Sequence, residues 1–229
     1  MGIPSTIATR IAFGTGLLAM LPTVMSSAWR HNKIKAVRWK ATLVLGLCGS
    51  AGALTGATLA AHLSGRTLQV GFGGLVLAIA LWMGFGRPVR LGEGSAEPRN
   101  EFWPLAVSGF PIGMVSGLTG LGGGVLIVPV LVLLWRFHVH VAIGTSVASI
   151  MFTSLGGVVG YIVNGLGVPA SLPYSIGYTN LPIGLCLAAT SIPMAQIGGR
   201  ASQALPAKQL RYIFIAGMVY AGLKMLGVF

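Results

Sequence analysis

Long apolar segments recur along the whole chain, and they limit the fold more strongly than any other feature. Each is close to the roughly 20 residues that a helix needs to cross the hydrocarbon of a bilayer. Only 8% of the residues are charged and the mean hydropathy is +0.83, which excludes an ordinary soluble globular protein. The short alternating segments of a transmembrane β-barrel are absent from the sequence. The sequence therefore predicts an all-α fold, a polytopic bundle of transmembrane helices.

Six of these segments are expected to cross the bilayer as single helices. They are 11–29, 41–63, 67–85, 141–163, 181–199 and 212–229. For the first, a secretory signal peptide is an alternative, because Arg10 precedes it and Ser26-Ser27-Ala28 could imitate a cleavage site.

A seventh apolar segment, 102–135, differs from the others in length and in glycine content. Its 34 residues would form roughly 50 Å of helix, too long for one crossing and short for two. Five glycines fall within the eight residues 117–124, near its middle. Glycine-rich backbone forms helix poorly and leaves N–H and C=O groups without helical partners. A membrane tolerates such groups only where protein or a polar cavity covers them. We therefore predict two half-length helices that meet at the glycines, as a tight packing point or as a ligand site.

The basic residues indicate how this segment lies in the membrane, because cytoplasmic loops are enriched in Lys and Arg. If the segment crosses once, nine of the 15 basic residues lie on the cytoplasmic side, and five of these nine belong to the basic loop 30–40. If it enters and leaves on the cytoplasmic side, that side holds twelve basic residues, because it gains four and loses Lys224 relative to the first arrangement. The four are Arg136, Arg200, Lys208 and Arg211. The second arrangement, a re-entrant hairpin, fits the rule better.

The acidic residues restrict what such a bundle could transport. Only Glu93, Glu97 and Glu101 are acidic, and all three lie in the polar loop 86–101. Carriers of cations usually place carboxylates inside the membrane, so a transported species is expected to be an anion. The sequence lacks Gly-x-Ser-x-Gly, His-Glu-x-x-His and Walker motifs. We expect no enzymatic activity, no cofactor and no metal site.

An internal repeat divides the chain into residues 1–101 and 102–229. A shift of 130 residues places 12–15 on 142–145 and Thr23 on Thr153. Two related halves are common in secondary transporters, and the hairpin topology would make these halves inverted. This repeat argues against a signal peptide. Nothing before Ile11 matches 102–135, so either the chain begins after a first glycine-rich element or one such element suffices.

The glycine pattern resembles the sulfite exporter TauE/SafE family of membrane permeases. It reads Gly117-x-x-Gly120-x-Gly122-Gly123-Gly124 with Val128-Pro129, followed by Ala142-x-Gly144-Thr145-Ser146. In the first half, Ala12-x-Gly14-Thr15 and the basic loop with His31 also fit, although Gly16 stands where the second half has Ser146. The resemblance covers nearly the whole chain. It implies a two-repeat permease for small sulfur-containing anions such as sulfite or organosulfonates.

The candidate substrate-binding residues are those that could donate hydrogen bonds to an anion near the break. Free N–H groups at a helix N-terminus bind anions and carry partial positive charge. A half-helix beginning near 122–125 would supply them, and hydroxyls early in the helices of the two halves could add others. The candidates are Gly120, Gly122, Gly123, Gly124, Thr145, Ser146 and Thr15. Close helix packing by the glycines and hydroxyl bonds to the helix's own carbonyls are the alternatives.

The predicted function is a secondary transporter for small sulfur-containing or organic anions in the cytoplasmic membrane. A noncatalytic membrane scaffold or assembly subunit is the alternative. The expected partners are the lipid bilayer and a small anionic substrate, with a homo-oligomer possible and no nucleic acid involved.

Overall fold

The computed structural model describes residues 5–85, 102–135, 137–166 and 173–227, and nearly all of them are helical. The helices are α1 (Ser5–Lys33), α2 (Trp39–His62), α3 (Gly65–Phe85), α4 (Phe102–Thr119), α5 (Gly124–Leu133), α6 (Val139–Gly165), α7 (Leu181–Ala204) and α8 (Ala207–Leu226). Two short antiparallel strands, β1 (Ser175–Ile176) and β2 (Thr179–Asn180), form a small hairpin before α7. The predicted all-α bundle is confirmed.

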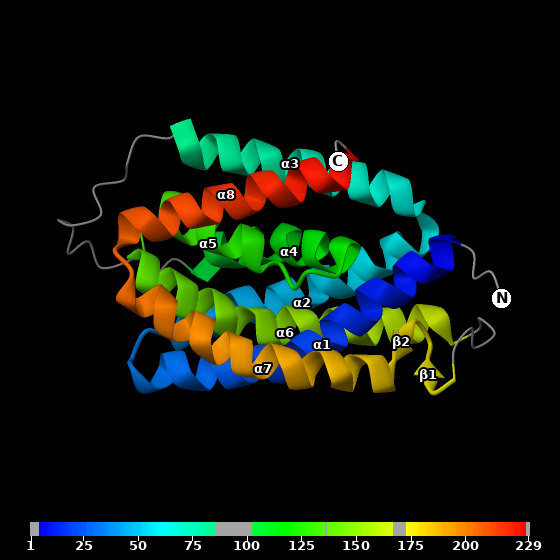
Figure 1. Cartoon of the computed structure of the whole chain (residues 1–229). Helices are drawn as coiled ribbons and strands as arrows, with labels where there is room; N and C mark the ends of the chain where they lie inside the picture. Colours follow the sequence, from blue (N-terminus) through cyan, green and yellow to red (C-terminus); the bar gives the residue numbers. More distant parts are fainter. Residues whose placement is uncertain (1–4, 86–101, 136, 167–172, 228–229) are drawn as a thin grey trace.

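The long helices lie side by side along one axis (Figure 1). Four of them are long and apolar enough to cross a membrane, judged by length and composition. These stretches are Ile7–Lys33, Trp39–His62, Val139–Gly165 and Leu181–Ala201, and α3 adds a shorter apolar stretch, Gly73–Gly84. Each of the six predicted crossing segments is helical over the residues that the structure describes, apart from Leu63 and Gly227 at the ends of two of them. The chain is thus a multi-pass helical membrane protein.

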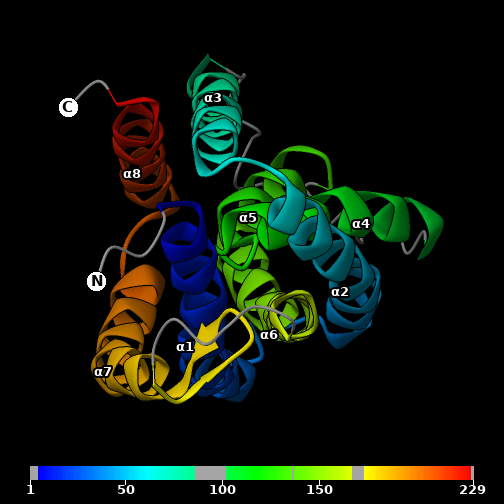
Figure 2. The same cartoon turned by 90° about the vertical axis from the view of Figure 1, so that its right-hand side faces the viewer.

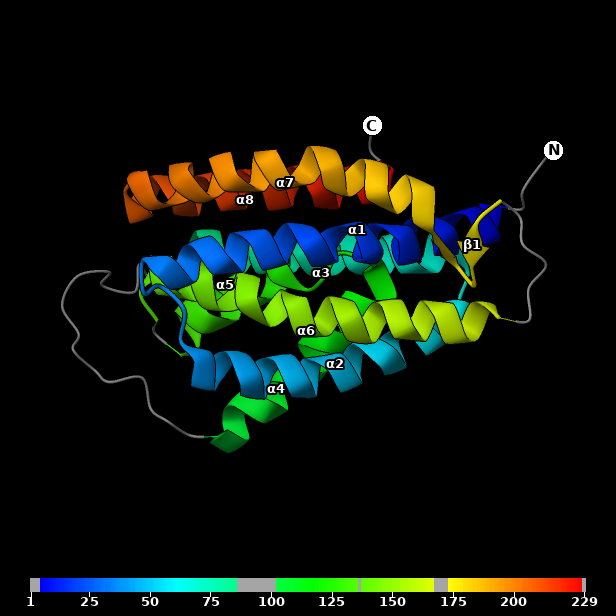
Figure 3. The ribbon, with the colours of Figure 1, turned by 90° about the horizontal axis from the view of Figure 1, so that it is seen from below.

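The helices form two groups in the bundle. Figure 2 shows α3 and α8 beside each other, apart from α2, α6 and α7. Figure 3 shows α1 between α7 and α6, and α2 packs on both α6 and α4. Helix α1 extends beyond the predicted 11–29. Its last turn carries Arg30, His31 and Lys33, and basic side chains are favourable there because the C-terminal end of a helix dipole is negative.

The glycine-rich segment is broken as the sequence predicts. Helix α4 ends at Thr119 and α5 begins at Gly124. The ten residues of α5 make only about 15 Å of helix, half of a bilayer crossing. The chain turns back at the break, which lies inside the bundle, so α4 and α5 both extend from it toward the end of the bundle where α6 begins (Figure 1). Entry into a membrane from one side remains a prediction.

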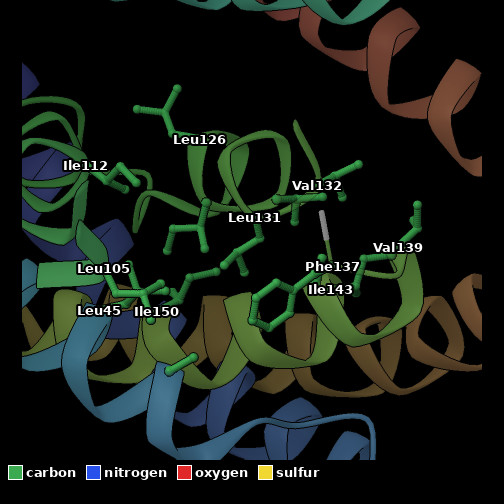
Figure 4. Packing of buried hydrophobic residues seen from close by; sticks show 14 of the residues in the cluster. Leu45, Leu105, Ile112, Leu126, Leu131, Val132, Phe137, Val139, Ile143 and Ile150 are labelled. Carbon is green, nitrogen blue, oxygen red and sulfur yellow. The ribbon is translucent and has the colours of Figure 1, made fainter. Parts of the chain in front are cut away.

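Helix α5 is held inside the largest hydrophobic cluster. Its side chains Leu126, Ile127 and Leu131 are buried, and Leu131 is fully so. They pack among apolar residues of α2, α4 and α6, including Leu45, Leu105, Ile143 and Ile150 (Figure 4). Because protein surrounds it, this short helix need not contact lipid along its length.

Small residues bring the backbones of α2 and α4 into direct contact. Gly49, Gly52 and Gly56 on α2 face Gly109, Gly113 and Gly117 on α4 or the backbone between them. A Cβ placed on Gly113 would lie 2.5 Å from the Cα of Gly49, closer than real Cβ atoms approach. Glycines at spacings of three and four therefore dock α4 against the bundle.

The two halves contact each other through matched positions of the repeat. Thr15 on α1 accepts a hydrogen bond from the Asn180 N–H at 3.0 Å, and Asn180 is the residue before α7. Thr145 on α6 accepts one from the Arg38 N–H at 3.1 Å, and Arg38 is the residue before α2. Each threonine thus contacts the start of a helix that belongs to the other predicted half. The division into repeats at residue 101 remains a prediction, which this reciprocity supports.

Basic residues lie at both ends of the bundle. The connection between α1 and α2 and the connection between α7 and α8 lie at one end, whereas α1 and α3 begin at the other (Figure 1). Lys35 and Lys208 belong to the first end, and Arg10 and Arg66 belong to the second. Arg87, Arg90, Arg99 and Arg136, which also enter the predicted charge count, lie outside the described residues.

Candidate functional site at the glycine break

The turn between α4 and α5 requires glycine at three positions. Gly120, Gly122 and Gly123 have φ values of 68°, 68° and 74°, in the left-handed region that other residues rarely adopt. The Gly120 N–H donates to the Ser116 carbonyl at 2.9 Å and closes the end of α4. The break is therefore a fixed turn rather than a loose linker.

Helices α1 and α6 enclose the turn from both halves of the chain. A Cβ on Gly120 would meet Phe13, and one on Gly122 would meet Met20 and Ile150. Met20 and Ile150 are 130 residues apart, so the same repeat position from each half contacts Gly122. Gly122 and Gly123 are buried. Protein therefore covers Gly122 and Gly123, whereas Leu121 of the same turn is 37% exposed.

Side chains of α6 satisfy carbonyl groups of the broken backbone. The Thr153 hydroxyl donates to the Gly122 carbonyl at 3.0 Å. The fully buried Tyr161 donates its hydroxyl to the Gly117 carbonyl at 2.9 Å. These bonds provide the partners that carbonyl groups freed by a helix break need in a membrane.

Unlike these carbonyl groups, three amide groups of the turn have no hydrogen-bond partner among the described residues. Within the described part of the chain, the N–H groups of Gly122, Gly123 and Gly124 donate no hydrogen bond. Further along α5, the N–H groups of Leu126 and Ile127 both donate to the Gly123 carbonyl at 3.0 Å. The start of α5 thus presents unpaired donors and the positive end of a helix dipole.

Two buried serines border these amides. Ser116 on α4 and Ser154 on α6 are both 0% exposed, and neither hydroxyl has a partner among the described residues. A Cβ on Gly122 would lie 3.2 Å from the Ser154 Oγ, and one on Gly123 would lie 3.1 Å from the Ser116 Cβ. Ser116 and Ser154 are not among the site residues predicted from the sequence. The sequence features that could have indicated them are the position of Ser116 directly before Gly117 and that of Ser154 two helical turns after Ser146.

The structure separates the predicted site residues into two sets. Gly122, Gly123 and Gly124 lie together at the unpaired amides, whereas the donors of Gly120 and Ser146 are used within the chain. Ser146 donates to the Ile143 carbonyl at 2.8 Å. Thr145 lies eight residues before Thr153, roughly 12 Å away along α6, and Thr15 faces Asn180.

The cavities beside the break are apolar. One of about 310 Å³ is lined by Leu121 of the turn and by residues of α3 and α8 such as Val76 and Phe214. Another of about 220 Å³ lies between α3 and α4 and touches Thr119. Both suit lipid chains or apolar side chains better than an anion.

Basic residues greatly outnumber acidic ones in the sequence. It has 15 Lys and Arg residues and three acidic residues, and all three acidic residues lie within 86–101. Arg10 on α1 donates to the Tyr178 hydroxyl at 3.2 Å, and the Tyr178 N–H donates to the Tyr161 carbonyl at 3.2 Å. This chain of contacts links a cation near the start of α1 to the helix that encloses the turn.

A model of the family described as sulfite exporter TauE/SafE matches residues 2–225. The chain belongs to this family. This TauE/SafE protein is 29% identical to a probable membrane transporter protein of Methanocaldococcus jannaschii, over 98% of the chain and 81% of the relative. It is also 29% identical to a probable membrane transporter protein of Haemophilus influenzae, over 97% of the chain and 83% of the relative. No solved structure matches. Family and relatives together identify this TauE/SafE protein as a membrane transporter.

Proposed function

We propose that the protein is a secondary permease that moves small sulfur-containing or organic anions, such as sulfite or organosulfonates, across the cytoplasmic membrane. The anion binds at the glycine break, against the N–H groups of Gly122, Gly123 and Gly124. One observation carries this proposal: at the break the carbonyls of Gly117 and Gly122 have hydroxyl partners, whereas the three amides have no partner among the residues that the structure describes.

The difference between carbonyls and amides selects the kind of ligand. A buried amide without an acceptor costs free energy, so a group that fills this place must accept hydrogen bonds. Oxyanions do so with several oxygens, and the helix dipole of α5 favours their charge. A cation would meet unpaired donors and no carboxylate among the described residues.

The enclosure of the turn fits transport by alternating access. Helices α1 and α6 come from different halves and contact Gly122 through Met20 and Ile150. Movement of one half against the other would open the turn to either side of the membrane in succession. In this scheme Thr15 and Thr145 act at the junctions of the halves, through their bonds to Asn180 and Arg38.

A noncatalytic scaffold is the second candidate, and the packing of the glycines favours it. A Cβ at Gly113 or Gly122 would collide with neighbouring atoms, so packing alone accounts for those glycines. Packing does not account for the unpaired amides of the turn.

Transport in proteoliposomes tests the proposal. Proteoliposomes that contain the purified chain should take up labelled sulfite, methanesulfonate or a small carboxylate, driven by a gradient of the anion or of protons. Liposomes without the protein should not. A correctly folded chain that moves none of these anions under either gradient would refute the permease and favour the scaffold.

A further inference from the structure

We propose that Ser116 and Ser154 are anion-binding residues that complete, with the amides of 122–124, a site without any charged side chain, and that this site selects singly charged oxyanions. This inference rests on the proposed function and deepens it, because it names further ligand-binding residues and a substrate class.

The two serines approach the turn from different helices. Ser154 comes from α6 and lies beside Gly122, whereas Ser116 comes from α4 and lies beside Gly123. Thr153, the neighbour of Ser154, donates to the Gly122 carbonyl and fixes this part of α6 against the turn. The two serines therefore lie beside neighbouring glycines of the turn and come from different helices.

The hydroxyls of Ser116 and Ser154 differ from those of three other serines in the helices. Ser108, Ser146 and Ser149 each donate to a carbonyl three or four residues earlier in their own helix. Ser116 and Ser154 are 0% exposed and make no such bond within the described residues. A buried polar group without a partner needs an explanation, and a ligand supplies one.

The donors around this place define the ligand. Amides can only donate, and Thr153 already gives its proton to Gly122. A bound group that pairs three amides and two hydroxyls needs several acceptor oxygens on one centre, as in a sulfonate or hydrogensulfite.

The absence of a charged side chain among these five groups sets the preferred charge. The helix dipole of α5 supplies only about half an elementary charge. A single negative charge is compatible with such a site, but a second would be buried without compensation, at high cost. Methanesulfonate should therefore bind better than sulfate, although both present oxygens around sulfur.

Binding and transport by three variants test the proposal, with methanesulfonate and sulfate as probes. The variants are Ser116→Ala, Ser154→Ala and Ser149→Ala, the last a control because that buried hydroxyl bonds to Thr145 of its own helix. Binding is measured on the detergent-purified full chain as a rise in the thermal unfolding midpoint, and transport is measured in proteoliposomes.

Methanesulfonate should raise the midpoint of the natural chain and of Ser149→Ala equally. Each of the other two variants should bind it about tenfold or more weakly, because each loses a hydrogen bond to a charged group. Without ligand, Ser116→Ala and Ser154→Ala should unfold at the natural midpoint or above, because each removes an unpaired buried hydroxyl. Sulfate should bind the natural chain at least tenfold more weakly than methanesulfonate.

Each contrary result has its own meaning. Unchanged binding in both serine variants overturns their role, and if the natural chain still transports methanesulfonate, the permease proposal stands. Equal binding of sulfate overturns the charge preference. Binding that depends on the serines without transport refutes the permease and keeps the site. A natural chain that neither binds nor transports methanesulfonate overturns both.

Discussion

Replacement of Gly123 by alanine separates a ligand-binding turn from a packing point. Gly123 has φ 74°, and a Cβ there would lie 3.1 Å from the Ser116 Cβ and 3.4 Å from the Ile112 Cγ2. The left-handed conformation costs a non-glycine residue roughly 1–2 kcal/mol. The two contacts are tight but need only a small shift of side chains. The variant should therefore fold, with its stability lowered by about 2 kcal/mol.

The effect on transport should be much larger than the effect on stability. The added methyl group lies between α4 and the turn, beside Ser116, where the proposed anion contacts the amides. Loss of one hydrogen bond to a charged group costs roughly 1.5–3 kcal/mol, which corresponds to about 10- to 150-fold weaker binding. Gly123→Leu fills the same place more completely and should abolish transport.

The assay is uptake of labelled methanesulfonate into proteoliposomes, with the unfolding midpoint of each protein measured in parallel. Gly198→Ala on α7 is the matched control, because a Cβ at Gly198 meets nothing within 4 Å. It should keep the natural rate of uptake. Natural rates in folded Gly123→Ala or Gly123→Leu protein would show that the turn does not bind substrate.

Three further substitutions test the contacts around the turn. Thr153→Val removes the donor to the Gly122 carbonyl and should lower the free energy of unfolding by about 1–3 kcal/mol; an unchanged midpoint would contradict this role. Gly113→Ala forces α4 away from Gly49 and should cost about 1–3 kcal/mol or more, visible as a lower midpoint and weaker expression; natural stability would mean that α2 and α4 are not in contact. Thr145→Val removes the acceptor of the Arg38 N–H and should slow transport with a loss of only about 1 kcal/mol in stability; natural uptake would argue against a junction between the halves.

The arrangement of the helices could be predicted because the bilayer imposes simple requirements on sequence. Apolar length predicted the six long helical segments, and the excess length of 102–135 together with its glycines predicted the break between Thr119 and Gly124. The glycine spacing on α2 is typical of a helix that another backbone approaches closely, and in the structure this neighbour is α4. These features depend on residues near one another in sequence, where periodicity and length carry the information.

The partners of the turn could not be predicted in the same way. Thr153 and Tyr161 reach it from 31 and 44 residues away, and which face of α6 meets α5 is set by packing. The predicted repeat pairs Thr15 with Thr145 but does not indicate which way they face, and in the structure both contact the start of a helix from the other predicted half. Ser146 has a carbonyl of its own helix within reach, which sequence alone does not distinguish from a free hydroxyl.

The position of a bound sulfonate tests the central claim most directly. Bromomethanesulfonate is a singly charged sulfonate whose bromine gives an anomalous signal in crystals of the protein. We predict an anomalous peak beside the sulfonate at the turn, next to Gly122, Gly123 and Gly124 and within reach of Ser116 and Ser154. A peak at another place in the bundle, in protein that transports this anion, would contradict a binding site at the glycine break.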